Sequence, residues 1–134
     1  MRRSTALLAS IGALAMAATG CGAEDHPNGL RPPSPIEVSA LVNSERVVIS
    51  PKDFGAGLAN FTISNQSADR VQLTFDGPVD AAGEAIGPGS VAQFKVDLRA
   101  GDYQVEAGPD SFAEPADLVV GPERESAQND LLLP

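Results

Sequence analysis

Short runs of alternating hydrophobic and polar residues fill the middle of the chain, across residues 36–120. The clearest run covers residues 71–75, where Val71, Leu73 and Phe75 are separated by polar residues. A period of two places alternate side chains on opposite faces of a β-strand. We therefore predict a half-buried strand here, with these three side chains facing the core.

Similar runs predict six further strands, which Gly, Pro, Asn and Asp residues separate. Their ranges are 36–41, 46–50, 58–65, 91–98, 102–107 and 116–120. A polar Asn43-Ser44-Glu45 turn joins the first two, and we expect residues 76–89 to form a turn-rich connection. Gly101 can adopt a positive φ just before the strand at 102–107. No segment after Cys21 has helical periodicity of useful length.

Seven short strands within about 85 residues predict an all-β fold, a Greek-key sandwich. The chain has a single cysteine, Cys21, which lies outside this region, so no disulfide can stabilise the domain. Tryptophan is absent, and the core must be built mainly from Val, Ile, Leu and the five Phe residues.

The N-terminus has the layout of a signal peptide: Arg2 and Arg3, an apolar stretch over residues 6–18, and then Ala18-Thr19-Gly20-Cys21. This pattern resembles a bacterial lipoprotein signal with its lipobox. The resemblance implies that the Cys21 thiol receives a diacylglyceryl group and that residues 1–20 are removed. The mature protein would then be held at the extracytoplasmic face of the cell membrane by its N-terminal lipid.

Two other interpretations of this segment stay open. The lipobox usually has Leu three residues before the cysteine, where this chain has Ala18. Ordinary secretory cleavage after Ala15-Met16-Ala17 would leave Cys21 as a free thiol. A retained anchor helix is the third reading, although residues 6–18 are short against the roughly 20 residues of a membrane span. We expect lipidation, because two acyl chains suffice for stable anchoring.

The mature chain divides into three zones. Residues 21–35 are rich in Pro and Gly, and we expect a flexible tether. The predicted sandwich occupies residues 36–121, and residues 122–134 are predicted to be a disordered tail. The tail ends in Leu131-Leu132-Leu133-Pro134, which either frays or docks on the domain or on a partner.

The chain is acidic, with 9 basic and 18 acidic residues and a formal charge of −9. Loss of Arg2 and Arg3 with the signal leaves seven basic residues and a charge of −11. No basic patch is visible, so the sequence argues against nucleic-acid binding. An acidic surface keeps a domain soluble and attracts cations or basic partners. We expect a monomeric domain, with an envelope protein as its candidate partner.

The order of features resembles the cupredoxin family. Four segments carry the resemblance: Val48-Ile49-Ser50-Pro51, Phe61-Thr62-Ile63-Ser64-Asn65, Gly87-Pro88-Gly89 and Leu98-Arg99-Ala100-Gly101-Asp102-Tyr103. In this family and in other Greek-key sandwiches, such a tyrosine hydroxyl pins a corner of the chain. An immunoglobulin-like or fibronectin-like sandwich is the alternative fold.

The resemblance assigns the ligands of a blue-copper site to four positions, which here hold Arg70, Ala107, Asp110 and Pro115. Such a site needs two His nitrogens, one Cys thiolate and usually a weak axial Met. None of the four residues is of these types. After Cys21 the chain has one histidine, His26, and no methionine. We therefore expect a domain without a metal or cofactor, in which these four positions are degenerate.

Other metal sites have little support in the sequence. His26 lies near Glu24 and Asp25 in the tether, where a single imidazole makes a weak site. Asp76, Asp80 and Glu84 offer oxygen ligands to calcium, but the EF-hand spacing is absent.

Catalytic and glycosylation motifs are equally weak. With the single His in the tether and the single Cys at the lipid site, no Ser-His-Asp or Cys-His arrangement can form in the domain. Asp110 and Glu114 are the carboxylates that the resemblance singles out, because they lie in the loop that carries the family's ligands. Asn60 and Asn65 begin Asn-x-Ser/Thr motifs, which we interpret as strand and turn residues.

These observations predict a membrane-anchored binding or structural module of the cell envelope. The expected working surface comprises Arg70 and the segments 76–89 and 107–115, because sandwiches commonly carry their sites on loops. An envelope protein that handles metal ions with carboxylates is the first alternative. An enzyme of unrecognised type is the second.

Overall fold

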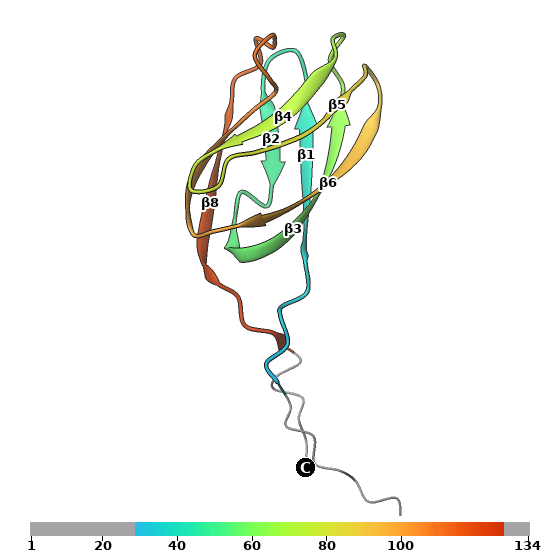
Figure 1. Cartoon of the computed structure of the whole chain (residues 1–134). Coiled ribbons are helices and arrows are strands. Elements are labelled where there is room, and N and C mark those ends of the chain that lie inside the picture. The colour runs from blue at the N-terminus through green and yellow to red at the C-terminus, as the bar shows by residue number, and fades with distance from the viewer. Residues whose placement is uncertain (1–28, 128–134) are drawn as a thin grey trace, which may run out of the picture.

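The computed structural model describes residues 29–127 (Figure 1). This part of the chain is an all-β sandwich, as predicted, and it contains eight strands. Their bounds are β1 (Ile36–Val42), β2 (Val47–Ser50), β3 (Asp53–Asn65), β4 (Val71–Asp76), β5 (Ala81–Ile86), β6 (Val91–Leu98), β7 (Gly101–Glu106) and β8 (Ala116–Glu123). All seven predicted strands are present, and β5 is additional.

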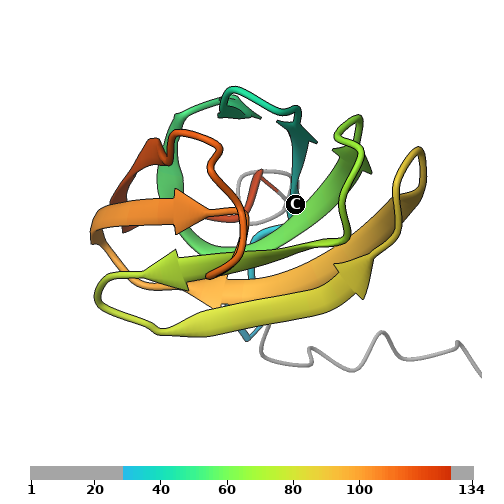
Figure 2. The same cartoon turned by 90° about the horizontal axis from the view of Figure 1, so that it is seen from above.

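The strands form two layers that share β3. In one layer the order is β2-β1-β3-β6, with β1 parallel to β3 and β6 antiparallel to it. In the other layer β8, β7, β4 and β5 follow one another, and the first residues of β3 pair in parallel with β8. Viewed from above, the strands of the two layers curve around the core (Figure 2).

The core follows the predicted alternation. Val71, Leu73 and Phe75 are all buried, which confirms the expectation for this strand. Phe61 of β3 lies at the centre, with its ring edge-on to Phe75 at a centroid distance of 4.9 Å. This is the geometry that aromatic pairs favour, and it joins the two layers.

The expectation of a turn-rich connection over residues 76–89 is wrong in its second half, where β5 forms. β5 consists mostly of small residues, so the preference for β-branched and aromatic residues gave no signal. Pairing with β4 produces the strand: Phe75 lies opposite Ala81 and Val71 opposite Ile86. A register shift between Gln72 and Thr74 interrupts this ladder.

The predicted end of the domain at residue 121 is also wrong, because β8 continues to Glu123 and the chain beyond it stays packed. Arg124 is half-buried and donates hydrogen bonds from its guanidinium to the carbonyls of Gly55, Ser34 and Leu58 at 3.0–3.1 Å. At Gly55 a Cβ atom would lie 2.7 Å from the carbonyl oxygen of Pro122. Glycine is therefore required where β3 approaches the C-terminal segment, a contact that the sequence pattern does not reveal.

The connection between β6 and β7 crosses from one layer to the other. Gly101 has a φ of 146°, as the sequence suggested, and a Cβ there would collide with the ring of Pro78. The Tyr103 hydroxyl donates a hydrogen bond of 3.0 Å to the carbonyl of Arg99. This is the tyrosine corner of β-sandwiches, and it confirms the expected role of Tyr103.

Both ends of the described chain leave the domain on the same side (Figure 1). We call this side, with residues 29–35 and 121–127, the base end. The opposite side carries the loops at 43–46, 66–70, 87–90 and 108–115, and we call it the loop end. The two ends therefore present different segments of the chain to solvent.

Candidate binding site at the loop end

Asn65, the last residue of β3, organises the loop end. Its side chain is completely buried. The amide Nδ2 donates to the carbonyls of Asp69 and Ile86 at 2.7 and 3.0 Å, and Oδ1 accepts hydrogen bonds from the Ser67 backbone N–H and hydroxyl at 2.9 and 2.7 Å. Its backbone exchanges hydrogen bonds with Ser90 and Gly89. One buried amide thus fixes the loops at 66–70 and 87–90 relative to each other.

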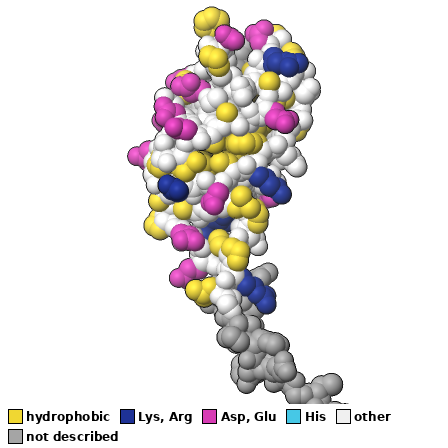
Figure 3. All heavy atoms as spheres, viewed as in Figure 1, with side chains coloured by type: hydrophobic (Ala, Val, Ile, Leu, Met, Phe, Trp, Pro, Cys, Tyr) yellow, Lys and Arg dark blue, Asp and Glu magenta, His cyan; other side chains and the backbone are white. Residues whose placement is uncertain are grey.

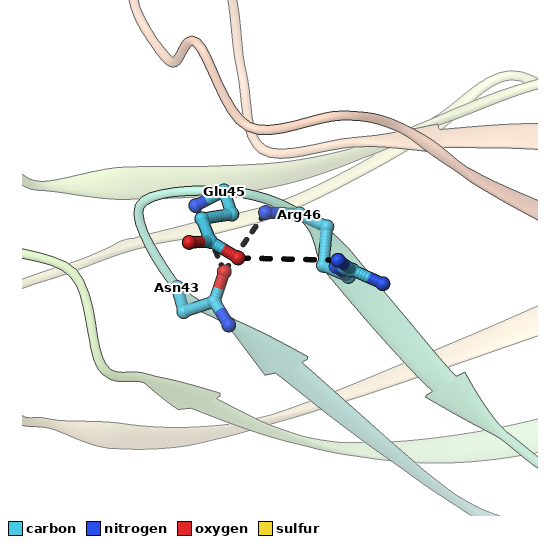
Figure 4. Close-up of polar contacts among 3 residues, drawn as sticks. All are labelled: Asn43, Glu45 and Arg46. Carbon is cyan, nitrogen blue, oxygen red and sulfur yellow. Dashed lines mark hydrogen bonds and ion pairs between the residues drawn. The ribbon is translucent and has the colours of Figure 1, made fainter.

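A second set of hydrogen bonds joins the loop at 108–115 to the turn between β1 and β2. Asn43 Oδ1 accepts hydrogen bonds from the backbone N–H groups of Glu45 and Arg46 at 2.9 and 2.8 Å, which confirms the predicted turn (Figure 4). Glu114 N–H then donates to the Glu45 carbonyl at 2.7 Å, and Val47 N–H to the Glu114 carbonyl at 2.8 Å. The ion pair of Glu45 with Arg46, at 3.9 Å and exposed, adds little.

A surface cavity of about 240 Å³ opens at this end. Its lining includes Arg70, Ala107 and Asp110, three of the four positions that the resemblance assigns to ligands, but not Pro115. Gln72 and Ser111 add polar atoms to the lining. The structure therefore gathers Arg70, Ala107 and Asp110 at one place, although they come from two separate loops.

The cavity offers a guanidinium, a carboxylate and a buried methyl group. Arg70 and Asp110 are exposed, and Ala107 is buried at the end of β7. The Arg70 guanidinium has no hydrogen bond or ion pair with any residue in 29–127. Such a site can hold a small polar or acidic group by hydrogen bonding.

The carboxylates singled out in the sequence do not come together. Among the residues that the structure describes, no three acidic, His or Cys side chains are grouped so as to hold a metal ion, so Asp76, Asp80 and Glu84 form no such site. Glu114 is not part of the cavity lining that includes Asp110.

The expected working surface is divided by the fold. Arg70 and the loop at 108–115 lie at the loop end, as does the turn at 87–90. Residues 76–80 follow β4 to the other side, where a Cβ on Gly77 would meet the ring of Tyr103. Proximity along the chain was misleading here because β5 carries the chain from one end of the sandwich to the other.

The two Asn-x-Ser/Thr motifs have structural roles. Asn60 is buried on β3, and its amide donates to both carboxylate oxygens of Glu37 at 3.1 and 2.8 Å. Asn65 is the buried residue that organises the loop end. Neither side chain is accessible, which supports the interpretation of both as strand and turn residues.

Phe112 is the residue of this end that sequence reasoning missed. Its side chain is fully exposed, while its neighbour Ala113 is buried. Val91, at the start of β6, is the second strongly exposed hydrophobic side chain here. The sequence signal was an aromatic residue inside a loop bounded by Pro109 and Pro115, which does not by itself predict exposure.

Cys21, His26 and Leu131-Leu132-Leu133 lie outside the described residues, so the expectations for the lipid site, the tether histidine and the tail remain predictions. Within residues 29–127, no helix has the length and apolar character needed to cross a membrane. No protein-family model matches the chain, and no curated protein matches its sequence.

Proposed function

We propose that this chain is a cell-envelope lipoprotein, anchored through a lipid on Cys21, whose sandwich is a binding module that presents its loop end away from the membrane. One observation carries the proposal. Both ends of the described chain leave the domain at the base end, opposite the loops and their cavity (Figure 1). A lipid at the N-terminus then faces the base end toward the membrane and leaves the loop end accessible.

The length of the tether supports this arrangement. The Arg124 guanidinium holds the Ser34 carbonyl at 3.0 Å, so the chain is attached to the domain from this residue onward. The 14 residues from Cys21 to Ser34 span at most about 45 Å when fully extended. The domain is therefore kept close to the membrane surface.

The finer fold assignment, a cupredoxin-like sandwich that works without metal, belongs to the same proposal. The tyrosine corner at Tyr103 supports it, and so does the shared cavity of Arg70, Ala107 and Asp110. Arg70 places a permanent positive charge where the resemblance implies a histidine nitrogen, and this charge repels metal cations. We propose that the cavity now serves recognition of a polar or acidic group on an envelope partner.

Cell fractionation tests the anchor. Cys21→Ala should move the protein from the membrane fraction to the soluble fraction, because no acyl chain is attached. Ala18→Leu, which restores the usual lipobox residue, is the matched control and should stay in the membrane fraction. A wild-type protein that is already soluble would indicate ordinary secretion, and a Cys21→Ala protein that stays membrane-bound would indicate a retained anchor; either result contradicts the proposal.

Metal analysis tests the proposal that the sandwich is a binding module without a metal ion. We expect the Cys21→Ala protein, purified from the soluble fraction and dialysed, to contain no stoichiometric copper, zinc or calcium. A stoichiometric metal ion that is lost on Asp110→Asn would favour the alternative of metal handling by carboxylates. Arg70→Ala should leave the metal content unchanged in either case.

A further inference from the structure

Phe112 combines full exposure with a firmly held backbone. Its side chain is completely accessible to solvent. On one side, Ser111 N–H donates to the Gly108 carbonyl at 3.2 Å, and on the other, Ala113 N–H donates to the Ser111 hydroxyl at 3.2 Å. The buried methyl of Ala113 and the Glu114–Glu45 hydrogen bond complete the attachment. The loop therefore presents an aromatic ring that the domain itself does not use.

An exposed aromatic side chain on an ordered loop is suited to be an interface anchor. Phe buries a large apolar area when it enters a pocket, and aromatic residues dominate binding energy at protein interfaces. Because the loop is already ordered, little conformational entropy is lost when a partner binds. Val91, exposed at the same end, can extend the apolar contact.

The charges around Phe112 indicate the chemistry of the partner. Acidic residues outnumber basic ones in the four loops of this end; the charged residues are Glu45, Asp69, Asp110, Glu114, Arg46 and Arg70. Hydrophobic side chains form the outermost tip of this end, with acidic side chains beside them (Figure 3). A complementary surface is an apolar pocket with Lys or Arg residues on its rim.

We infer that Phe112 is the anchor of a protein-docking surface at the loop end, and that its partner is an envelope protein offering an apolar pocket with a basic rim. The inference rests on the proposed function, because the anchor on Cys21 is what turns this end away from the membrane. The Arg70 cavity lies beside the anchor and takes up a polar or acidic group of the same partner.

Two other occupants fit this surface less well. A lipid surface is disfavoured because the loops are acidic and lie opposite the tether. A second copy of this chain is disfavoured because both copies would present their loop ends away from the same membrane. A two-fold contact between loop ends would turn the Cys21 lipid of one copy away from the bilayer.

Photo-crosslinking of the full-length, lipidated protein in its native cells is the first test. Phe112→p-benzoylphenylalanine should give a discrete crosslinked product with one protein. The same replacement at Val119 or Leu58, which are exposed on strands away from the loops, should not. Absence of a product at 112, equal products at the control positions, or a crosslinked dimer of the chain itself would overturn the inference.

Affinity measurements complete the test, with the partner that crosslinking identifies purified in its free form. Phe112→Ser should weaken binding about 30-fold or more, the loss typical of truncating an aromatic anchor, and Val119→Ser less than about threefold. Association should slow as salt is raised, since complementary charges steer it. An unchanged affinity of Phe112→Ser would overturn the inference, as would Phe112-dependent binding to phosphatidylcholine or phosphatidylglycerol vesicles.

A further crosslinking position separates this inference from the proposed function. A discrete product from Arg70→p-benzoylphenylalanine without one from position 112 would overturn the role of Phe112 and leave the binding module standing. Failure of Cys21→Ala to release the protein from the membrane fraction would contradict the lipid anchor, whichever residues contact the partner.

Discussion

The base end and the loop end of the sandwich are both held by side chains that bond to backbone carbonyls, but they leave different chemistry exposed. At the base end, Arg124 binds three carbonyls and Tyr103 binds that of Arg99, so the polar groups of both residues are used within the domain. At the loop end, Asn65 is equally well satisfied, yet Phe112 is fully exposed. The first end fixes the ends of the chain, whereas the second presents groups to a partner.

Leu30 is also exposed at the base end, beside a cavity of about 650 Å³ that Pro33 and Ser126 help to line. This residue adjoins the part of the chain that the structure does not describe. Phe112, in contrast, has described residues on both sides along the chain, and they hold its backbone in place. The two ends therefore differ in how the backbone of the exposed side chain is held. Substitutions at each end should reveal this difference.

Asn65→Ala should cause the largest loss. It removes four hydrogen bonds made by a completely buried side chain, which should lower the free energy of unfolding by about 3 kcal/mol. Urea denaturation of the Cys21→Ala protein, followed by circular dichroism, measures it. Gln66→Ala is the matched control, because this neighbouring side chain is exposed. Equal effects of the two substitutions would show that the loop end does not depend on the buried amide.

Arg124→Ala should have the next largest effect, at the base end. Three charge-assisted hydrogen bonds are lost, but the group is half-buried and water replaces part of them, so we expect a loss of about 2 kcal/mol. Hydrogen exchange should accelerate at the backbone amides of Ser34 and Ile36, since Pro33 and Pro35 have none, and not in the loop at 108–115. Arg70→Ala, the matched arginine at the loop end, should leave stability unchanged. Faster exchange at both ends would mean that the two ends are not independent.

Tyr103→Phe should cost about 1 kcal/mol, because it deletes only the hydroxyl that binds the Arg99 carbonyl. The ring stays in the core and the fold should be retained. Arg99→Ala keeps the carbonyl acceptor and should have a smaller effect in the same urea denaturation experiment. If Arg99→Ala proved the more harmful of the two, the exposed side chain of Arg99 would stabilise the corner instead of its backbone.

Some strands can be predicted from the sequence and others cannot, and the difference has a physical reason. Residues 71–75 were predicted correctly because large hydrophobic and polar residues alternate there, so the pattern itself records burial. β5 and the start of β3 were missed because they contain Ala and Gly, whose strand conformation depends on pairing with β4 and β8. Local preference carries little information at such positions.

The candidate site shows the same limit. The spacing of the resemblance led to Arg70, Ala107 and Asp110, which do line one cavity. It could not identify Phe112, because the exposure of a loop residue depends on how neighbouring loops hold its backbone. Here that information comes from Glu45 and Ala113, residues whose part in the loop end becomes visible only in three dimensions.

Phe112→Ser should have the smallest effect on folding, within about 0.5 kcal/mol in urea denaturation, because the exposed ring makes no contact that the folded domain needs. Phe61→Ala, which empties the centre of the core, should cost about 3–5 kcal/mol in the same assay. A loss above 1 kcal/mol for Phe112→Ser would mean that this ring packs on the domain in solution. The loop end would then be as self-contained as the base end, and the ring could anchor a partner only by first giving up that packing.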